Sequence, residues 1–177
     1  MNYNPLQRVW VVYQASRDAL KVTKLTLTHD DKETLLFHTT FESQNPTEAK
    51  QAIEKSLKEV EDLFVLSLWS TFERFLRNYL QQKGATLQMT KPAALAHPMY
   101  AYFCEEVEFW KPNQMLDLLK KSLFTTHPHL IGQAKQILGY RDWIAHGKNP
   151  NNDPSSNITA RFAYKILNEI VETLLLN

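Results

Sequence analysis

The sequence predicts a mainly helical protein, with a small β-hairpin near the N-terminus as the one expected departure. Glycine, which weakens helices, accounts for only 4 of the 177 residues, whereas Leu, Glu, Gln, Lys and Ala are abundant. From residue 45 onward, apolar side chains recur at intervals of three and four, the repeat of an amphipathic helix. Proline or polar capping residues stand where several of these repeats begin. Together these features predict an all-α bundle.

The N-terminal segment follows a different pattern from the rest of the chain. The apolar positions of residues 5–21 fit a helix, although part of this segment is also rich in β-prone side chains. Residues 24–28 and 34–41 alternate between apolar and polar side chains around a polar turn, which predicts a hairpin. We therefore expect an N-terminal extension over residues 1–44 and a helical bundle over residues 45–177.

A long helix is predicted from Asn45 to about Gly84. Asn45 at the N-cap, Pro46 at the first helical position and Glu48 at the third combine into a strong start signal. Apolar residues then recur at Ile53, Leu57, Val60, Phe64, Leu68, Phe72, Phe75 and Tyr79. Because this helix would be roughly 55 Å long, we expect a bend or a break within it. Residues 63–80, apolar on nearly every side, should form the central buried part.

One polar stripe interrupts the apolar surface of this helix, at Ser70, Glu73 and Arg77. A carboxylate on a mostly buried helix needs a partner, because an unpaired buried charge is costly. An internal pair between Glu73 and Arg77, four residues apart, is the simplest explanation. The other is that Glu73 faces a pocket formed by Arg141 and His146 of a later helix and helps to orient these side chains.

Shorter helices are predicted in the second half of the chain. Residues 85–98 contain two prolines and are expected to form a loop with a short helical turn. Helices are expected over residues 99–110 and 113–124, from residue 128 into the segment 138–148, and after a cap at residues 155–157.

The segment 138–148 reads L-G-Y-R-D-W-I-A-H-G-K. It contains three side chains of the types that act in catalysis: Arg141, Asp142 and His146. In a helix, Asp142 and His146 would lie four residues apart on one face, within reach of each other. Arg141 precedes His146 by five residues, about 140° around the helix axis, so the two can meet only where the helix ends. Gly147 suits a helix C-terminus because it accepts a left-handed conformation. We therefore expect His146 at a helix end, free to turn toward its neighbours.

Residues 140–147 resemble the Arg-x4-His motif of the HEPN superfamily. These are small helical domains, often metal-independent endoribonucleases of toxin–antitoxin, abortive-infection and CRISPR-type defence systems. The order of elements is also similar from about residue 45 to the end: a long helix with Glu73, shorter helices, the motif helix, a polar loop and a final helix. The resemblance implies an HEPN-like bundle and a homodimer in which Arg141 and His146 of both copies form one composite active site.

The residue types of the motif suit RNA cleavage, because RNA carries its own nucleophile, the 2′-hydroxyl. Histidine, whose ordinary pKa is about 6.5, is the usual base or acid near neutral pH. Arginine stabilises phosphate charge through its planar set of donors. We therefore assign His146 as general base or acid, Arg141 as phosphate clamp, Asp142 as the group that orients the imidazole and Glu73 as a supporting residue. Cleavage of this kind leaves 2′,3′-cyclic phosphate ends.

Lys148 and Trp143 are the expected substrate-binding residues, since Lys148 adds positive charge beside the motif and Trp143 can line the cleft. Lys148 also marks a departure from the family pattern. HEPN toxins that pair with a nucleotidyltransferase antitoxin carry a Tyr two residues after the His, so we do not expect that antitoxin here. The expected partners are RNA, a second copy of the chain and an antitoxin or regulatory partner of another kind.

Two other interpretations stay open. The chain can be a non-catalytic HEPN-like module that binds RNA, a nucleotide or a protein partner. It can also be a dimeric helical scaffold in which the motif only caps a helix, because Arg-x4-His arises by chance in many helical proteins.

The composition narrows the function classes further. A net charge of +1 provides no bulk field that would attract nucleic acid, so RNA contacts must come from a local patch. The single cysteine, Cys104, excludes an internal disulfide and a cysteine-rich zinc site. His127 and His129 flank a proline and suit a turn better than a metal site, so we expect no metal and no cofactor. No apolar run is long enough to span a bilayer and no secretory signal is evident, which predicts a cytoplasmic protein without membrane contacts.

Overall fold

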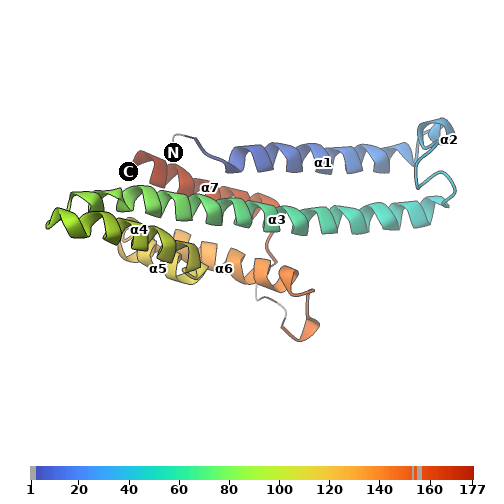
Figure 1. The fold of residues 1–177 in the computed structure, drawn as a ribbon. Helices are drawn as coiled ribbons and strands as arrows, with labels where there is room; N and C mark the ends of the chain where they lie inside the picture. Colours follow the sequence, from blue (N-terminus) through green and yellow to red (C-terminus); the bar gives the residue numbers. More distant parts are fainter. Residues whose placement is uncertain (1–2, 153, 155–156) are drawn as a thin grey trace.

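The computed structural model describes residues 3–152, 154 and 157–177, and these residues form an all-α fold, as predicted (Figure 1). The α-helices are α1 (Leu6–Thr26), α2 (Lys32–Leu35), α3 (Pro46–Gly84), α4 (Ala93–Phe109), α5 (Pro112–Lys121), α6 (Pro128–Ala145) and α7 (Ala160–Leu176). Two short 3₁₀ helices, η1 (Ala85–Met89) and η2 (Pro150–Asn152), lie between them. In the described part of the chain, no helix combines the length and apolar character needed to cross a membrane.

The predicted N-terminal hairpin is wrong, because no residue of the described ranges is in a strand. Helix α1 continues to Thr26, and the second expected strand is replaced by α2 and turns. Helix α1 runs alongside the first half of α3 (Figure 1). Leu27 and Leu36 of the connecting segment are buried against Ala49 and Ile53 of α3. A two-stranded hairpin would be marginal by itself, whereas helical packing on α3 buries these leucines.

Helix α3 runs unbroken from Pro46 to Gly84, so of the predicted bend or break, a break does not occur. The predicted start is confirmed: the Asn45 side chain accepts hydrogen bonds from the backbone N–H groups of Thr47 and Glu48 at 3.1 and 2.9 Å. The helix stays continuous because partners cover it along its length, α1 and then α4, α6 and α7.

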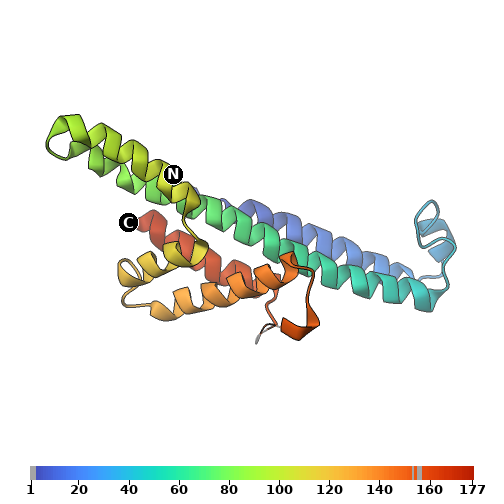
Figure 2. The same cartoon turned by 60° about the horizontal axis from the view of Figure 1, so that its bottom comes forward.

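The main core lies around the second half of α3, where side chains of α1, α5, α6 and α7 meet it. Helices α5 and α6 pack on each other, and α7 lies against α3 between α1 and α6 (Figures 1 and 2). Leu6 and Tyr13 of α1 belong to the same core cluster as the helices of the predicted bundle. The first helix therefore packs as part of the bundle's core.

Two predicted boundaries need correction. Helix α4 begins at Ala93 instead of residue 99, because Pro98 is accommodated inside the helix, on an exposed face. Helix α7 is capped by Thr159, whose hydroxyl accepts from the Phe162 N–H at 3.1 Å. Of the predicted cap residues 155–157, the first two lie outside the described residues. Asn157 instead accepts a hydrogen bond from the Tyr140 hydroxyl at 3.4 Å.

Candidate functional site

The motif forms the C-terminal end of α6, and its helix end has the predicted geometry. His146 is the C-cap residue and is exposed to solvent. Gly147 adopts φ +81°, and its N–H donates to the Ile144 carbonyl at 3.1 Å, while the Lys148 N–H donates to the Trp143 carbonyl at 2.9 Å. This pair of bonds is the Schellman arrangement, which requires the left-handed residue that Gly147 provides.

Arg141 lies between two carboxylates. Its Nη1 donates to Oδ1 of Asp142 at 2.7 Å, and its Nη2 lies 3.9 Å from Oε2 of Glu73. The side chain of Arg141 is partly exposed, so its outer edge remains open to solvent. Asp142 was predicted to orient the imidazole of His146. In this conformation its carboxylate holds the guanidinium of Arg141.

Glu73 of α3 lies between Arg141 of the motif helix and Arg77 of its own helix. Its Oε1 accepts from Nη2 of Arg77 at 2.7 Å, and its Oε2 accepts from Nε1 of Trp69 at 3.0 Å. The pair with Arg77 was predicted, and Glu73 also faces Arg141 across the gap between α3 and α6. Glu73 therefore pairs with Arg77 within α3 and faces Arg141 of α6 at the same time.

Arg77 also binds backbone carbonyls of α4, a contact that the sequence did not indicate. Its Nη1 donates to the carbonyls of Val107 and Glu108, and its Nη2 donates to the carbonyl of Trp110 at 3.0 Å. These carbonyls form the C-terminal end of α4, where a cation is favoured by the helix dipole. Arg77 therefore fixes the end of α4 beside Glu73.

A surface pocket of about 190 Å³ lies where these groups meet. It is lined by Ser70, Glu73, Arg74, Arg77 and Arg141. Arg74, which sequence reasoning missed, forms an ion pair with Glu108 at 3.0 Å. Its position could have been found, because residues 70, 73, 74 and 77 share one face of a helix. Three guanidinium groups therefore surround one pocket, and each of them is paired with a carboxylate: Arg74 with Glu108, Arg77 with Glu73 and Arg141 with Asp142.

Lys148 and Trp143 hold the loop after the motif. Nζ of Lys148 lies 2.8 Å from Oδ2 of Asp62 and 2.8 Å from Oε1 of Glu59. These two carboxylates raise the pKa of Lys148. Lys148 also adopts φ +57°, an unfavourable conformation for a residue with a Cβ, and its ion pairs help to hold it there. Nε1 of Trp143 donates to the Asn149 carbonyl at 3.0 Å.

Asp62, which Lys148 and Tyr140 both contact, is a buried carboxylate with a relative exposure of 2%. Its Oδ1 accepts a hydrogen bond from the Tyr140 hydroxyl at 2.8 Å, while Lys148 contacts its other oxygen. Sequence reasoning missed Asp62, although it shares the spacing of three and four with the buried residues Val65 and Trp69. A carboxylate on a buried stripe signals a partner elsewhere in the fold.

Buried tyrosines beside carboxylates predict loss of stability at alkaline pH. Burial raises the pKa of Tyr140 well above its ordinary value of 10.0, and the hydrogen bond to Asp62 adds to this. Burial and Glu61 raise the pKa of Tyr13 in the same way. The unfolded chain releases these protons near the ordinary pKa, so the stability present below it is lost as the pH rises toward the folded values. Urea unfolding between about pH 8 and about pH 11.5 should show this decline.

Tyr140→Phe is the informative variant, and it should make the alkaline decline shallower. Tyr3→Phe, at an exposed position, should leave the slope unchanged. Equal slopes for all three proteins would contradict the assignment of the decline to Tyr140.

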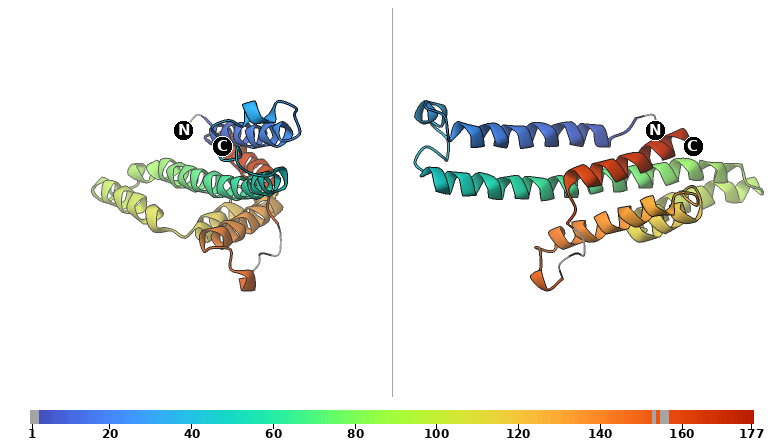
Figure 3. Two further views of the ribbon diagram at one scale, coloured as in Figure 1. Left: turned by 90° about the vertical axis from the view of Figure 1, so that its right-hand side faces the viewer. Right: turned by 180° about the vertical axis from the view of Figure 1, so that it is seen from behind.

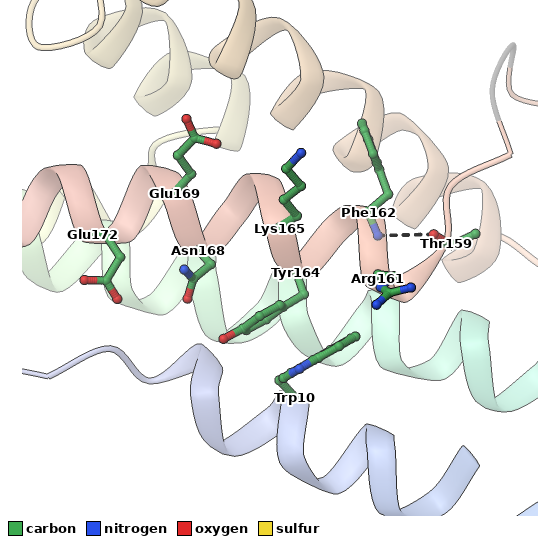
Figure 4. Close-up of a pocket in the computed structure, with 9 residues that line it drawn as sticks. All are labelled: Trp10, Thr159, Arg161, Phe162, Tyr164, Lys165, Asn168, Glu169 and Glu172. Atoms are coloured by element: carbon green, nitrogen blue, oxygen red, sulfur yellow. Dashed lines mark hydrogen bonds between the residues drawn. The ribbon is translucent and has the colours of Figure 1, made fainter. Parts of the chain in front are cut away.

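A surface groove of about 780 Å³ lies elsewhere, along α7 beside α1 (Figure 4). The ring of Trp10 stacks on that of Tyr164 with centroids 4.5 Å apart. Lys165 and Arg161 line the groove together with Glu169 and Glu172. Its charges are balanced, and no predicted site residue lines it.

The structure therefore brings Arg141, Asp142 and Glu73 together and leaves His146 exposed at the end of the same helix. No hydrogen bond or ion pair of the His146 side chain is found among the described residues. Nor do these residues contain a group of three or more His, Cys, Asp or Glu side chains suited to a metal ion. Comparisons with protein-family models, curated proteins and solved structures found no significant match.

Proposed function

We propose that the chain is a metal-independent endoribonuclease of the HEPN type, with Arg141 and His146 as its catalytic residues. The observation that supports this most directly is the end of α6. There, an imidazole without intramolecular partners among the described residues follows, by little more than one turn, a guanidinium held in place by Glu73 and Asp142. A positioned cation and a free base on one helix end are the two groups that phosphodiester cleavage needs.

The proposed reaction uses the 2′-hydroxyl of the RNA as nucleophile. His146 accepts the hydroxyl proton while the 2′-oxygen attacks the adjacent phosphorus, and the bond from phosphorus to the 5′-oxygen breaks. Arg141 stabilises the extra negative charge on the phosphoryl oxygens. In a homodimer, a protonated His146 of the second copy would donate its proton to the leaving 5′-oxygen. The products are a 2′,3′-cyclic phosphate and a 5′-hydroxyl.

The second candidate is a module that binds RNA, a nucleotide or a protein partner without cleaving RNA. One observation favours it: the guanidinium of Arg141 is already paired with Asp142 at 2.7 Å and faces Glu73. A phosphate would have to compete with these carboxylates, which lowers the net charge available to stabilise a transition state.

The test is cleavage of a single-stranded RNA by the purified protein in EDTA, with analysis of the product ends. We expect products with 2′,3′-cyclic phosphate and 5′-hydroxyl ends. The same RNA with 2′-O-methyl groups throughout should remain intact, because it lacks the nucleophile. Binding of both RNAs without cleavage of either would favour the non-catalytic module. Cleavage of the 2′-O-methyl RNA would contradict the proposed mechanism.

A further inference from the structure

Helix α4 presents a largely apolar stripe to solvent. The residues of this stripe are spaced alternately by four and by three, and they are Leu95, Met99, Tyr102, Glu106 and Phe109. Leu95, Met99, Tyr102 and Phe109 retain 51, 39, 65 and 82% of their accessible surface. Alternate spacing by four and three is the pattern of a coiled-coil seam, along which one helix packs against another. These five residues form the α4 seam.

The rest of the chain leaves the α4 seam uncovered. The buried residues Ala96 and Val107 lie about 110° around the helix axis from the centre of the seam. The ring of Phe103 packs on Gly84, where a Cβ would collide with it, and the neighbours of α4 are chiefly α3 and η1. The left view of Figure 3 shows α4, in yellow-green, standing away from α6 and α7. Single exposed apolar residues are ordinary, but four in one seam mark an interaction site.

Glu106 is the charged member of the α4 seam. Its carboxylate raises the pKa of the Tyr102 hydroxyl, through its charge and through the hydrogen bond that this hydroxyl donates to it. Among the described residues, neither Glu106 nor the exposed Glu105 next to it has a cationic partner. A helix that covered the seam would remove water from Glu106, and a buried charge without a partner is costly. The molecule that covers the seam must therefore bring a cation to Glu106.

A second copy of α4 does not supply this cation. Residues 93–109 contain no Lys or Arg, and their one histidine, His97, lies on the opposite side of the helix from the seam. Parallel pairing of two copies would place both Glu106 carboxylates together, and antiparallel pairing about Tyr102 would set each of them against the apolar Met99 of the other copy. A membrane surface is disfavoured for the same reason, because its acyl layer would take Glu106 out of water without a cation.

We propose that the α4 seam binds an amphipathic helix of another protein, whose own apolar seam carries a Lys or Arg opposite Glu106. The apolar side chains of the partner helix would pack between the apolar members of the α4 seam. A single polar position within such a seam specifies the register, so the pair at Glu106 fixes which turn of the partner lies against which turn of α4. Glu105, exposed beside the seam, favours a second basic residue on the partner. The proposal does not depend on RNA cleavage, and its test uses no RNA.

The first arm of the test measures the binding of two synthetic helical peptides by fluorescence anisotropy, at concentrations at which each peptide is monomeric. Both have three heptads with a leucine seam, and they differ at one central seam position, which is Lys in one and Glu in the other. We expect the wild type to bind the Lys peptide about 100-fold more tightly than the Glu peptide, because like charges in a desolvated seam repel each other.

The charge-reversed variant Glu106→Lys should invert this preference. Glu169→Lys makes the same charge change at an exposed position on α7, so it is the matched control and should keep the preference of the wild type. Failure of the wild type to bind the Lys peptide, or equal binding of the two peptides, would overturn the proposal. An inverted preference in Glu169→Lys would also overturn it, because net charge would then explain the binding.

The second arm places the peptide on the α4 seam. Phe109→Ala should raise the dissociation constant of the Lys peptide by a factor of about 10 or more, as truncation of an aromatic anchor does. Leu63→Ala, at an exposed apolar position on α3, should leave it unchanged. Both side chains are exposed, so both variants should unfold at the temperature of the wild type. Equal peptide binding by Phe109→Ala and wild type would overturn the proposal, as would self-association or vesicle binding through Phe109 in place of peptide binding.

Discussion

The His146→Ala variant is expected to lose RNA cleavage by a factor of about 10² to 10⁴, the usual contribution of a positioned general base or acid. The imidazole is exposed and makes no hydrogen bond or ion pair within the described residues, so its removal should leave the fold intact. The backbone N–H of His146 keeps its bond to the Asp142 carbonyl at 3.0 Å, and the helix end is fixed by Gly147. Initial cleavage rates in EDTA, compared at equal protein concentration, measure the effect.

His129→Ala is the matched control for this variant. His129 is exposed and lies on the same helix, at the opposite end. Its replacement should change neither cleavage nor unfolding. Equal cleavage by His146→Ala and wild type would remove His146 from the mechanism.

The features that the sequence predicted correctly depend on local chemistry. Asn45 and Pro46 mark the start of α3, because a cap and a fixed φ act within one turn. Gly147 marks the end of α6 for the same reason. The spacing of Glu73 and Arg77 likewise identified an ion pair within one helix.

The features that it missed depend on residues far apart in the chain. The segments 24–28 and 34–41 alternate between apolar and polar residues, as the strands of a hairpin do. Their residues Leu27 and Leu36 are nevertheless buried against α3, and this packing favours helices and turns. Arg77 binds the carbonyl end of α4, which its local sequence does not indicate. The same limit applies to Asp62, whose partners Tyr140 and Lys148 come from the other half of the chain.

The Asp62→Ala variant is expected to lose about 3 kcal/mol of unfolding free energy, because it breaks a buried ion pair and leaves a buried hydroxyl without its acceptor. Tyr140 is buried and loses the 2.8 Å hydrogen bond to Oδ1. Lys148 loses its buried partner at 2.8 Å and keeps only the exposed carboxylate of Glu59. The measurement is urea unfolding of the wild type and the variant at neutral pH.

Glu59→Ala provides the matched control, since Glu59 contacts the same ammonium at the same distance but is exposed. Its loss should cost no more than about 1 kcal/mol, the usual value of a surface ion pair. A second readout is amide hydrogen exchange at Lys148, whose left-handed backbone should open more readily once Asp62 no longer holds its side chain. Equal losses for the two variants would show that burial of Asp62 adds nothing. Unchanged exchange at Lys148 would separate this ion pair from the order of the loop that follows His146.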